Sequence, residues 1–217
     1  MDGAHMASKK SGEVDLSKWV TGLNEKNQSL SFRKGGYGEA IIDSLIREWF
    51  PHHHIAKVIN DNTAHLIDRL LVPKPETPYV KPIFLEVKTK ARRTFYNDSG
   101  MDEHNYWRLI TYQSNNEPKV FVAFVDEGSG CIYGNFLESL NEPCKTVRYG
   151  EEIEYPRTEM AKASNGKLSI TYFPMEKMSF RKKLPYEFIQ RLRQMSERNY
   201  PYADEEKVCE DSIIVGS

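Results

Sequence analysis

The chain has 217 residues, which is enough for one sizeable domain with elaborations. A hydrophobic content of 39% with 12% aromatic residues argues against disorder, and no apolar run approaches the length of a membrane span. The formal net charge of -1 does not by itself indicate a nucleic-acid binder. The three cysteines show no Cys-x-x-Cys spacing, which excludes a zinc knuckle and fits a reducing cytosol. We therefore expect a cytoplasmic protein with no membrane partner.

The composition changes along the chain and predicts four parts. They are a tag with a disordered lead-in, a core, a β-rich extension with a basic helix packed on that core, and a flexible acidic tail. Their expected bounds are 1–13, 14–142, 143–200 and 201–217. The first part lacks the apolar centre of a secretory signal, and we expect none of its residues to take part in a functional site.

Hydrophobic periodicity and turn residues predict the elements of the core. In chain order these are helices over 14–32 and 37–50, strands over 54–60, 64–72 and 81–89, a loop over 94–100, a helix over 101–116, hairpin strands over 119–126 and 128–137, and a helical turn over 137–142. Hairpin-type strands followed by a crossover helix imply an α/β fold with a mixed central β-sheet flanked by helices. The extension is predicted to hold strands over 145–156 and 167–175 and a basic helix over 185–198.

Two of the predicted strands carry charged side chains among apolar neighbours. Asp68 lies in the strand over 64–72, and Glu86 and Lys88 lie in the strand over 81–89. Ionised groups on mostly apolar strands are costly unless they are paired or coordinate a metal. Because side chains alternate across a strand, Glu86 and Lys88 point to the same face. With Asp68 beside them they would form an acidic pocket with an ammonium at its rim, which suits a hard divalent cation and a phosphodiester.

A fourth charged residue, Glu39, lies one turn before Ile42 in the predicted helix over 37–50 and borders its buried face. The plain alternative for Glu86 and Lys88 is a cross-strand ion pair, because a Glu-x-Lys triplet occurs by chance in most proteins of this size. The apolar strands on both sides, with Asp68 and Glu39, give the triplet its weight.

On these residues the sequence resembles the PD-(D/E)xK phosphodiesterase superfamily, the restriction-endonuclease-like nucleases. Glu39 matches the helical acidic residue of the family, Asp68 its central aspartate, and Glu86-Val87-Lys88 its ExK strand. The helix that holds Tyr112 and Gln113 matches the variable Tyr/Gln motif that follows. The sequence departs from the family pattern at one point, because no proline precedes Asp68. Many members of the family also lack this proline.

The resemblance implies a restriction-endonuclease-like core and a Mg²⁺-dependent deoxyribonuclease. Asp68, Glu86 and the carbonyl of Val87 would hold one or two Mg²⁺ ions, for which Mn²⁺ can substitute. Glu39 would bind a metal through water or orient its ligands. Lys88 would position the attacking water or stabilise the developing negative charge.

Other residues are candidates for contacts with DNA. Lys90, Arg92 and Arg93 follow the ExK strand and would contact phosphates, unless they belong to a solvated loop. Tyr112 and Gln113 would position a base, a sugar or water, and a place in the core is at least as good an account of Tyr112. Gln113 is therefore the better catalytic candidate of the two.

Two other kinds of function remain open at this point. A protein of the same fold can bind DNA without cutting it, or can serve as a scaffold that binds a protein partner through residues 145–200. The presence of Glu39, Asp68, Glu86 and Lys88 together favours an enzyme. A homodimer would fit the cutting of both strands, which takes two sites.

Overall fold

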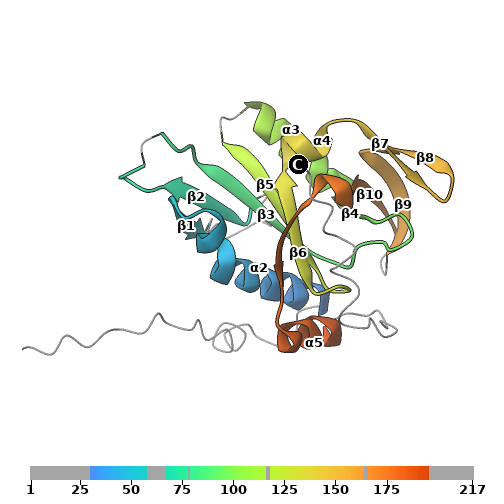
Figure 1. Ribbon diagram of the computed structural model, residues 1–217, viewed down its shortest axis with the longest axis horizontal. Coiled ribbons are helices and arrows are strands. Elements are labelled where there is room, and N and C mark those ends of the chain that lie inside the picture. Colours follow the sequence, from blue (N-terminus) through green and yellow to red (C-terminus); the bar gives the residue numbers. More distant parts are fainter. Residues whose placement is uncertain (1–29, 58–66, 78, 116–117, 164–165, 196–217) are drawn as a thin grey trace, which may run out of the picture.

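The computed structural model describes residues 30–57, 67–77, 79–115, 118–163 and 166–195 (Figure 1). The parts predicted over 1–13 and 201–217, most of the helix predicted over 14–32, and the connection between the strands predicted over 54–60 and 64–72 lie outside the described residues. None of the described helices is long and apolar enough to cross a membrane.

The largest sheet has six strands in the order β1-β2-β3-β5-β6-β11. Their bounds are His53–Lys57, Arg69–Pro73, Ile83–Thr89, Lys119–Asp126, Cys131–Phe136 and Ser179–Lys183. β3 and β5 are parallel and joined through helix α3, whereas the other neighbouring strands are antiparallel. The predicted α/β architecture with a mixed central sheet flanked by helices is therefore confirmed.

Helices cover both faces of this sheet. Helices α2 (Leu30–Trp49) and α5 (Tyr186–Gln194) pack on one face, where Leu85 and Val87 point. Helices α3 (Glu103–Asn115) and α4 (Leu137–Asn141) pack on the other, where Phe84 points. Because successive side chains of β3 alternate between two apolar layers, a charged residue on this strand has little access to solvent.

The remaining strands form two small sheets at one side of the molecule (Figure 1). Three strands pair in the order β4-β10-β9, and β7 pairs with β8. Their bounds are Asp98–Asp102, Gly166–Pro174 and Arg157–Ala163 for the first sheet and Cys144–Arg148 and Glu151–Tyr155 for the second, with a short 3-10 helix, η1, at Met175–Lys177.

Several predicted bounds were wrong, each for a physical reason. The predicted loop over 94–100 and the first residues of the helix over 101–116 contain β4, because Met101 and Asp102 pair with Thr171 and Ile170. The central sheet also takes its edge strand β11 from the part of the chain beyond residue 143, where it pairs with β6. Both strands depend on partners far away in the sequence.

Helix α2 begins seven residues before the predicted start at Tyr37 and runs through three glycines. Gly38 faces β3, where an added Cβ would lie 1.8 Å from Thr89 Oγ1 and 3.0 Å from Thr89 Cβ. Gly35, by contrast, has no atom within 4 Å of an added Cβ. Gly38 therefore lets α2 approach the end of β3 that carries the charged residues.

We predict opposite effects of alanine at these two glycines. Gly38→Ala forces α2 away from Thr89 and should lower the free energy of unfolding by about 1–3 kcal/mol. Gly35→Ala is the matched control and should raise it by up to about 1 kcal/mol, because glycine is a poor helix former. Urea denaturation followed by circular dichroism measures both, and equal stabilisation by the two variants would contradict the close packing.

Candidate functional site

Asp68 and Glu86 face each other where β2 begins. In the antiparallel register Arg69 pairs with Leu85, so the preceding residue, Asp68, stands opposite Glu86. The Asp68 N–H donates to Leu85 O at 3.1 Å. Asp68 thus lies immediately before β2 and not inside a strand over 64–72 as predicted. The predicted meeting of Asp68 with the Glu86-Lys88 strand is nevertheless present.

The backbone of Val87 is held by the carboxylate of Asp68. The Val87 N–H donates to Asp68 Oδ2 at 2.6 Å, in place of a ladder bond to β2. Since the N–H and C=O of one strand residue point to the same side, the Val87 carbonyl also faces the Asp68 side of β3. Three oxygen donor groups therefore meet here: two carboxylates and one carbonyl.

Glu86 is buried and only half satisfied. Its side chain is 4% exposed, and Oε1 lies 2.5 Å from Lys88 Nζ. Among the described residues, Oε2 has no hydrogen-bond partner. A buried carboxylate oxygen without a partner is energetically costly, and such groups are common where an ion or substrate binds.

The site raises the pKa of three carboxyl groups, those of Glu86, Asp68 and Glu39. Burial, followed by the charge of Asp68, raises the pKa of Glu86 to about 8 despite the opposing charge of Lys88. Burial is also the main cause of the raised pKa values of Asp68 and Glu39. Burial by itself would lower the pKa of Lys88, but the charges of Glu86, Asp68 and Asp102 outweigh it and raise that pKa. Lys88 is therefore charged here, as an ammonium group beside Glu86.

Arg69 joins this site to helix α2, and the sequence did not single it out. It is 2% exposed and donates two bonds of 2.7 Å to Asp43, one of 3.0 Å to Glu39 and one of 2.7 Å to Asp68 O. Its one sequence signal is its place next to Asp68, at the head of the apolar run Leu70–Val72.

The oxygen donors of this site have the chemistry that a hard divalent cation requires. Asp68, Glu86 and the Val87 carbonyl offer oxygen atoms only, which suits Mg²⁺, and the unpartnered Glu86 Oε2 is a ligand atom without another use. In the part of the chain that the structure describes, no three Asp, Glu, His or Cys side chains already form a metal-binding group. The residues present fit the ion, and in the structure Lys88 pairs with Glu86 while Arg69 pairs with Glu39.

Two residues predicted on α3 lie further along the sheet. Gln113 Oε1 accepts a hydrogen bond from the Val120 N–H at 3.3 Å, and Val120 pairs with Phe84, two positions before Glu86. The ring of Tyr112 packs edge-on against Phe84 at 5.1 Å. These contacts fasten α3 to the starts of β3 and β5, and the roles predicted for both residues in the reaction remain predictions.

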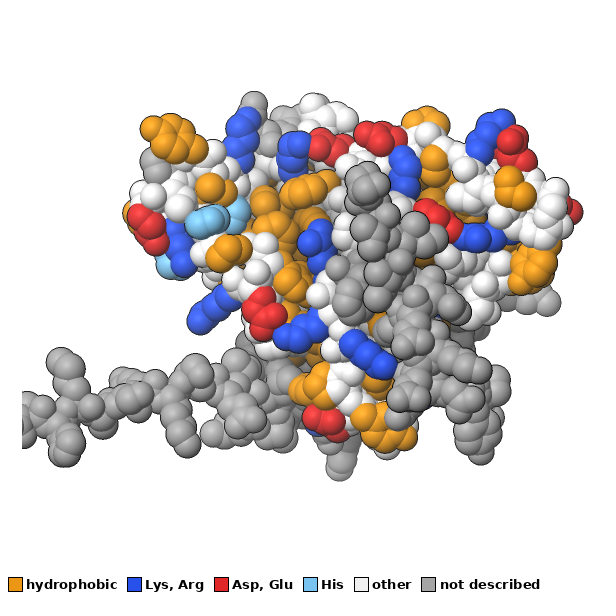
Figure 2. Space-filling model, viewed as in Figure 1, with side chains coloured by type: hydrophobic (Ala, Val, Ile, Leu, Met, Phe, Trp, Pro, Cys, Tyr) orange, Lys and Arg blue, Asp and Glu red, His pale blue; other side chains and the backbone are white. Residues whose placement is uncertain are grey.

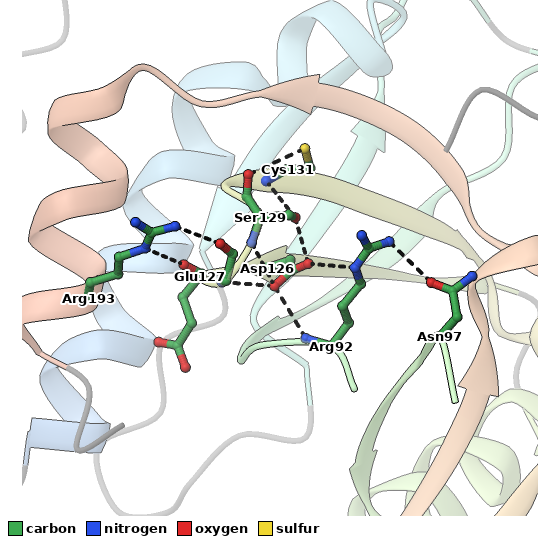
Figure 3. A network of polar contacts seen from close by, with 8 residues as sticks. Arg92, Asn97, Asp126, Glu127, Ser129, Cys131 and Arg193 are labelled. Atoms are coloured by element: carbon green, nitrogen blue, oxygen red, sulfur yellow. Dashed lines mark hydrogen bonds and ion pairs between the residues drawn. The ribbon is translucent and has the colours of Figure 1, made fainter. Parts of the chain in front are cut away.

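Arg92 belongs to a buried polar network at the end of β5 (Figure 3). Its Nε lies 3.5 Å from Asp126 Oδ2, and its Nη1 donates to Asn97 Oδ1 at 3.3 Å. Asp126 also accepts from the Gly128 N–H at 2.9 Å and from the Ser129 hydroxyl at 2.6 Å. Burial raises the pKa of Asp126. The network ties the loop after β3 to the β5–β6 turn.

Helix α5 is fastened to the same turn. Arg193 donates to the carbonyl oxygens of Glu127 at 3.3 Å and Gly128 at 2.7 Å (Figure 3). From α2, Lys34 Nζ lies 3.0 Å from the Glu127 carboxylate. The two helices on this face of the sheet are thus linked through one turn.

Arg93 is engaged inside the protein as well. It donates to both oxygens of Asp98 at 2.7 and 2.6 Å and to Glu159 at 2.5 Å. On the face shown in Figure 2, basic and acidic side chains of the described residues are interspersed. Contacts of Lys90, Arg92 and Arg93 with phosphate remain predictions, and for the two arginines they would compete with internal ion pairs.

Comparisons with known proteins give little further information. No protein-family model and no curated protein matches the sequence. Among solved structures, the chain is similar to Archaeoglobus fulgidus Hjc, a Holliday junction resolvase from an archaeal hyperthermophile. The TM-score is 0.30 at 11% sequence identity, and the match covers 59% of this chain and 83% of that chain. A TM-score this low does not establish a common fold.

We predict that Glu86 makes the protein less stable as pH rises. Its carboxyl group has an ordinary pKa of 4.5 when unfolded and about 8 when folded, so between these values the folded protein holds a proton that the unfolded chain releases. The free energy of unfolding should therefore fall through this window. Glu86→Gln removes the titrating group. Above pH 8 its free energy of unfolding should exceed that of the wild type by on the order of 1–3 kcal/mol.

Urea denaturation in EDTA at a series of pH values measures this difference. Glu154→Gln, at an exposed carboxylate on β8, serves as the control and should follow the wild-type profile. Parallel profiles for Glu86→Gln and the wild type would contradict the buried, protonated state of Glu86.

Proposed function

We propose that this protein is a metal-dependent nuclease of the PD-(D/E)xK type that hydrolyses phosphodiester bonds in DNA. The observation that supports this most is the placement of Asp68 opposite Glu86, with Lys88 on the same strand and one Glu86 oxygen buried without a partner among the described residues. Structural ion pairs do not need an excess of buried carboxylates. A site that binds a cation and a phosphodiester does.

Asp68, Glu86 and the Val87 carbonyl would hold Mg²⁺, with Mn²⁺ as a substitute. Such an ion supplies Lewis acidity at the phosphate and lowers the pKa of a bound water. Within the chain itself, Asp68 fixes the Val87 peptide, and Arg69 fixes Glu39 beside it. These contacts orient the donor atoms before a ligand arrives.

Lys88 would act on the substrate as a cation. The ammonium group is held at Glu86 Oε1, and neighbouring carboxylates raise its pKa. A charged group of this kind stabilises the negative charge that develops on the phosphate oxygens. Once Glu86 is engaged by another cation, its attraction for Lys88 is weaker, and the ammonium is available to the phosphate.

A DNA-binding subunit without activity is the second candidate. Two internal ion pairs favour it. Arg69 pairs with Glu39, and Lys88 pairs with one oxygen of Glu86, so these carboxylates have counter-charges within the chain. This candidate predicts binding to DNA that depends on salt but no cleavage.

The nuclease proposal predicts metal-dependent cleavage that three side chains control. Supercoiled plasmid and linear single- and double-stranded DNA are incubated with Mg²⁺, Mn²⁺ or EDTA. We expect Asp68→Asn, Glu86→Gln and Lys88→Ala each to lower the cleavage rate by at least about 100-fold, since each removes a charge used at the phosphate. Lys145→Ala and Glu154→Gln, at the exposed pair on β7 and β8, are matched controls and should cut as the wild type does.

Circular dichroism and thermal melting confirm that the variants are folded. Isothermal titration calorimetry with Mg²⁺ gives a second measurement, in which Asp68→Asn and Glu86→Gln should no longer bind Mg²⁺. DNA binding without cleavage by the wild type would favour the second candidate. Cleavage by all three site variants at the wild-type rate would refute this site.

A further inference from the structure

Two exposed aromatic rings stack on each other where the loop after β3 meets the β7–β8 hairpin. The ring centroids of Phe95 and Tyr149 are 4.5 Å apart, and the ring planes differ by 16°. Phe95 is nevertheless 56% exposed and Tyr149 is 76% exposed. The rings hold each other in place while most of their surface faces solvent, so burial of apolar area does not explain their presence.

Tyr149 also occupies an unfavourable backbone conformation. Its φ is 53°, and the φ of Gly150 is 84°. These two residues connect Arg148 and Glu151, the last pair of the hairpin, as in a type I′ turn. The first position of such a turn favours Asn, Asp or Gly, and a bulky aromatic residue there is strained. A strained position that carries an exposed ring points to a use for the ring.

The base of this aromatic pair is rigid. Phe95 packs edge-on against Tyr96 at 4.9 Å. The guanidinium of Arg93 lies 4.4 Å from the ring centre of Tyr96 and 3.5 Å from that of Tyr172. Arg93 is in turn fixed by Asp98. The pair therefore projects from an ordered cluster and not from a loose loop.

Strand β4 connects this pair to the candidate site. At one end, Asp98 is bound by Arg93, and at the other end, Asp102 acts electrostatically on Lys88. Five strand residues span roughly 13 Å at about 3.3 Å per residue. The platform and the candidate site therefore lie toward opposite ends of one short strand.

We propose that Phe95 and Tyr149 form a stacking platform for an unpaired nucleobase, so that the substrate is DNA with a single-stranded segment. The inference rests on the proposed function, because it takes a nucleic acid as the ligand of Lys88 and its neighbours. Aromatic faces accept any base by stacking, whereas bases inside a duplex already stack on each other. The arginines beside the platform are paired, Arg148 with Glu176 and Arg93 with Asp98, so the rings and not a basic surface carry the recognition.

Binding of a fluorescein-labelled oligothymidylate and of a labelled blunt-ended duplex, both in EDTA, tests the platform in the full chain. Tyr149→Asn removes the ring and suits the turn, so the variant should fold at least as well as the wild type. We expect it to bind the single strand about tenfold more weakly, with duplex binding unchanged. Tyr149→Phe keeps the aromatic ring and should bind the single strand as the wild type does. Phe95→Ala should reproduce the loss.

A single 2-aminopurine in the oligonucleotide gives an independent signal, since stacking quenches its fluorescence. Quenching by the wild type and by Tyr149→Phe, and its loss in Tyr149→Asn, would support the platform. Three results for Tyr149→Asn would overturn it. They are unchanged binding of the single strand, an equal loss of affinity for single strand and duplex, and a changed melting temperature with no change in binding. Stacking without any metal-dependent cleavage would refute the proposed nuclease and leave the platform standing.

Discussion

Four carboxylates share two cations at the junction of helix α2 with strands β2 and β3. Arg69 contacts Glu39 and Asp43, and Lys88 contacts Glu86, while Asp68 stands opposite Glu86 with its carboxylate on a backbone N–H. Four negative and two positive groups leave a formal excess of two negative charges around the buried Glu86 and Arg69. A protein meets such an excess by protonation or by a counter-ion.

The raised pKa of Glu86 is the first of these responses, and a divalent cation would be the second. This balance explains why the ionisable groups of the site are held so firmly by the backbone. Helix α2 comes close to β3 at Gly38, which brings Glu39 and Asp43 within reach of Arg69. Asp68 replaces the missing ladder partner of Val87. The sheet thus positions the carboxylates, although their mutual repulsion opposes their approach.

The sequence predicted the centre of this arrangement because two strands with alternating side chains are a local pattern. Asp68, Glu86 and Lys88 could be assigned to one face from their spacing and their apolar neighbours. Arg69 was missed because its partners lie on α2, and nothing in the strand itself tells a buried arginine from a solvated one. Likewise, β4 was taken for a loop because the polar run Asp98–Gly100 has little strand propensity, and its pairing depends on β10.

The position of β11 has a consequence for the synthesis of this chain. β6 is complete at Phe136, but the strand that covers its outer edge begins only at Ser179. While the ribosome adds the residues between them, the nascent chain presents an apolar strand whose free N–H and C=O groups can pair with another molecule. A protein shortened before Ser179 would keep that edge for good. Such an open edge favours pairing with other copies of the chain.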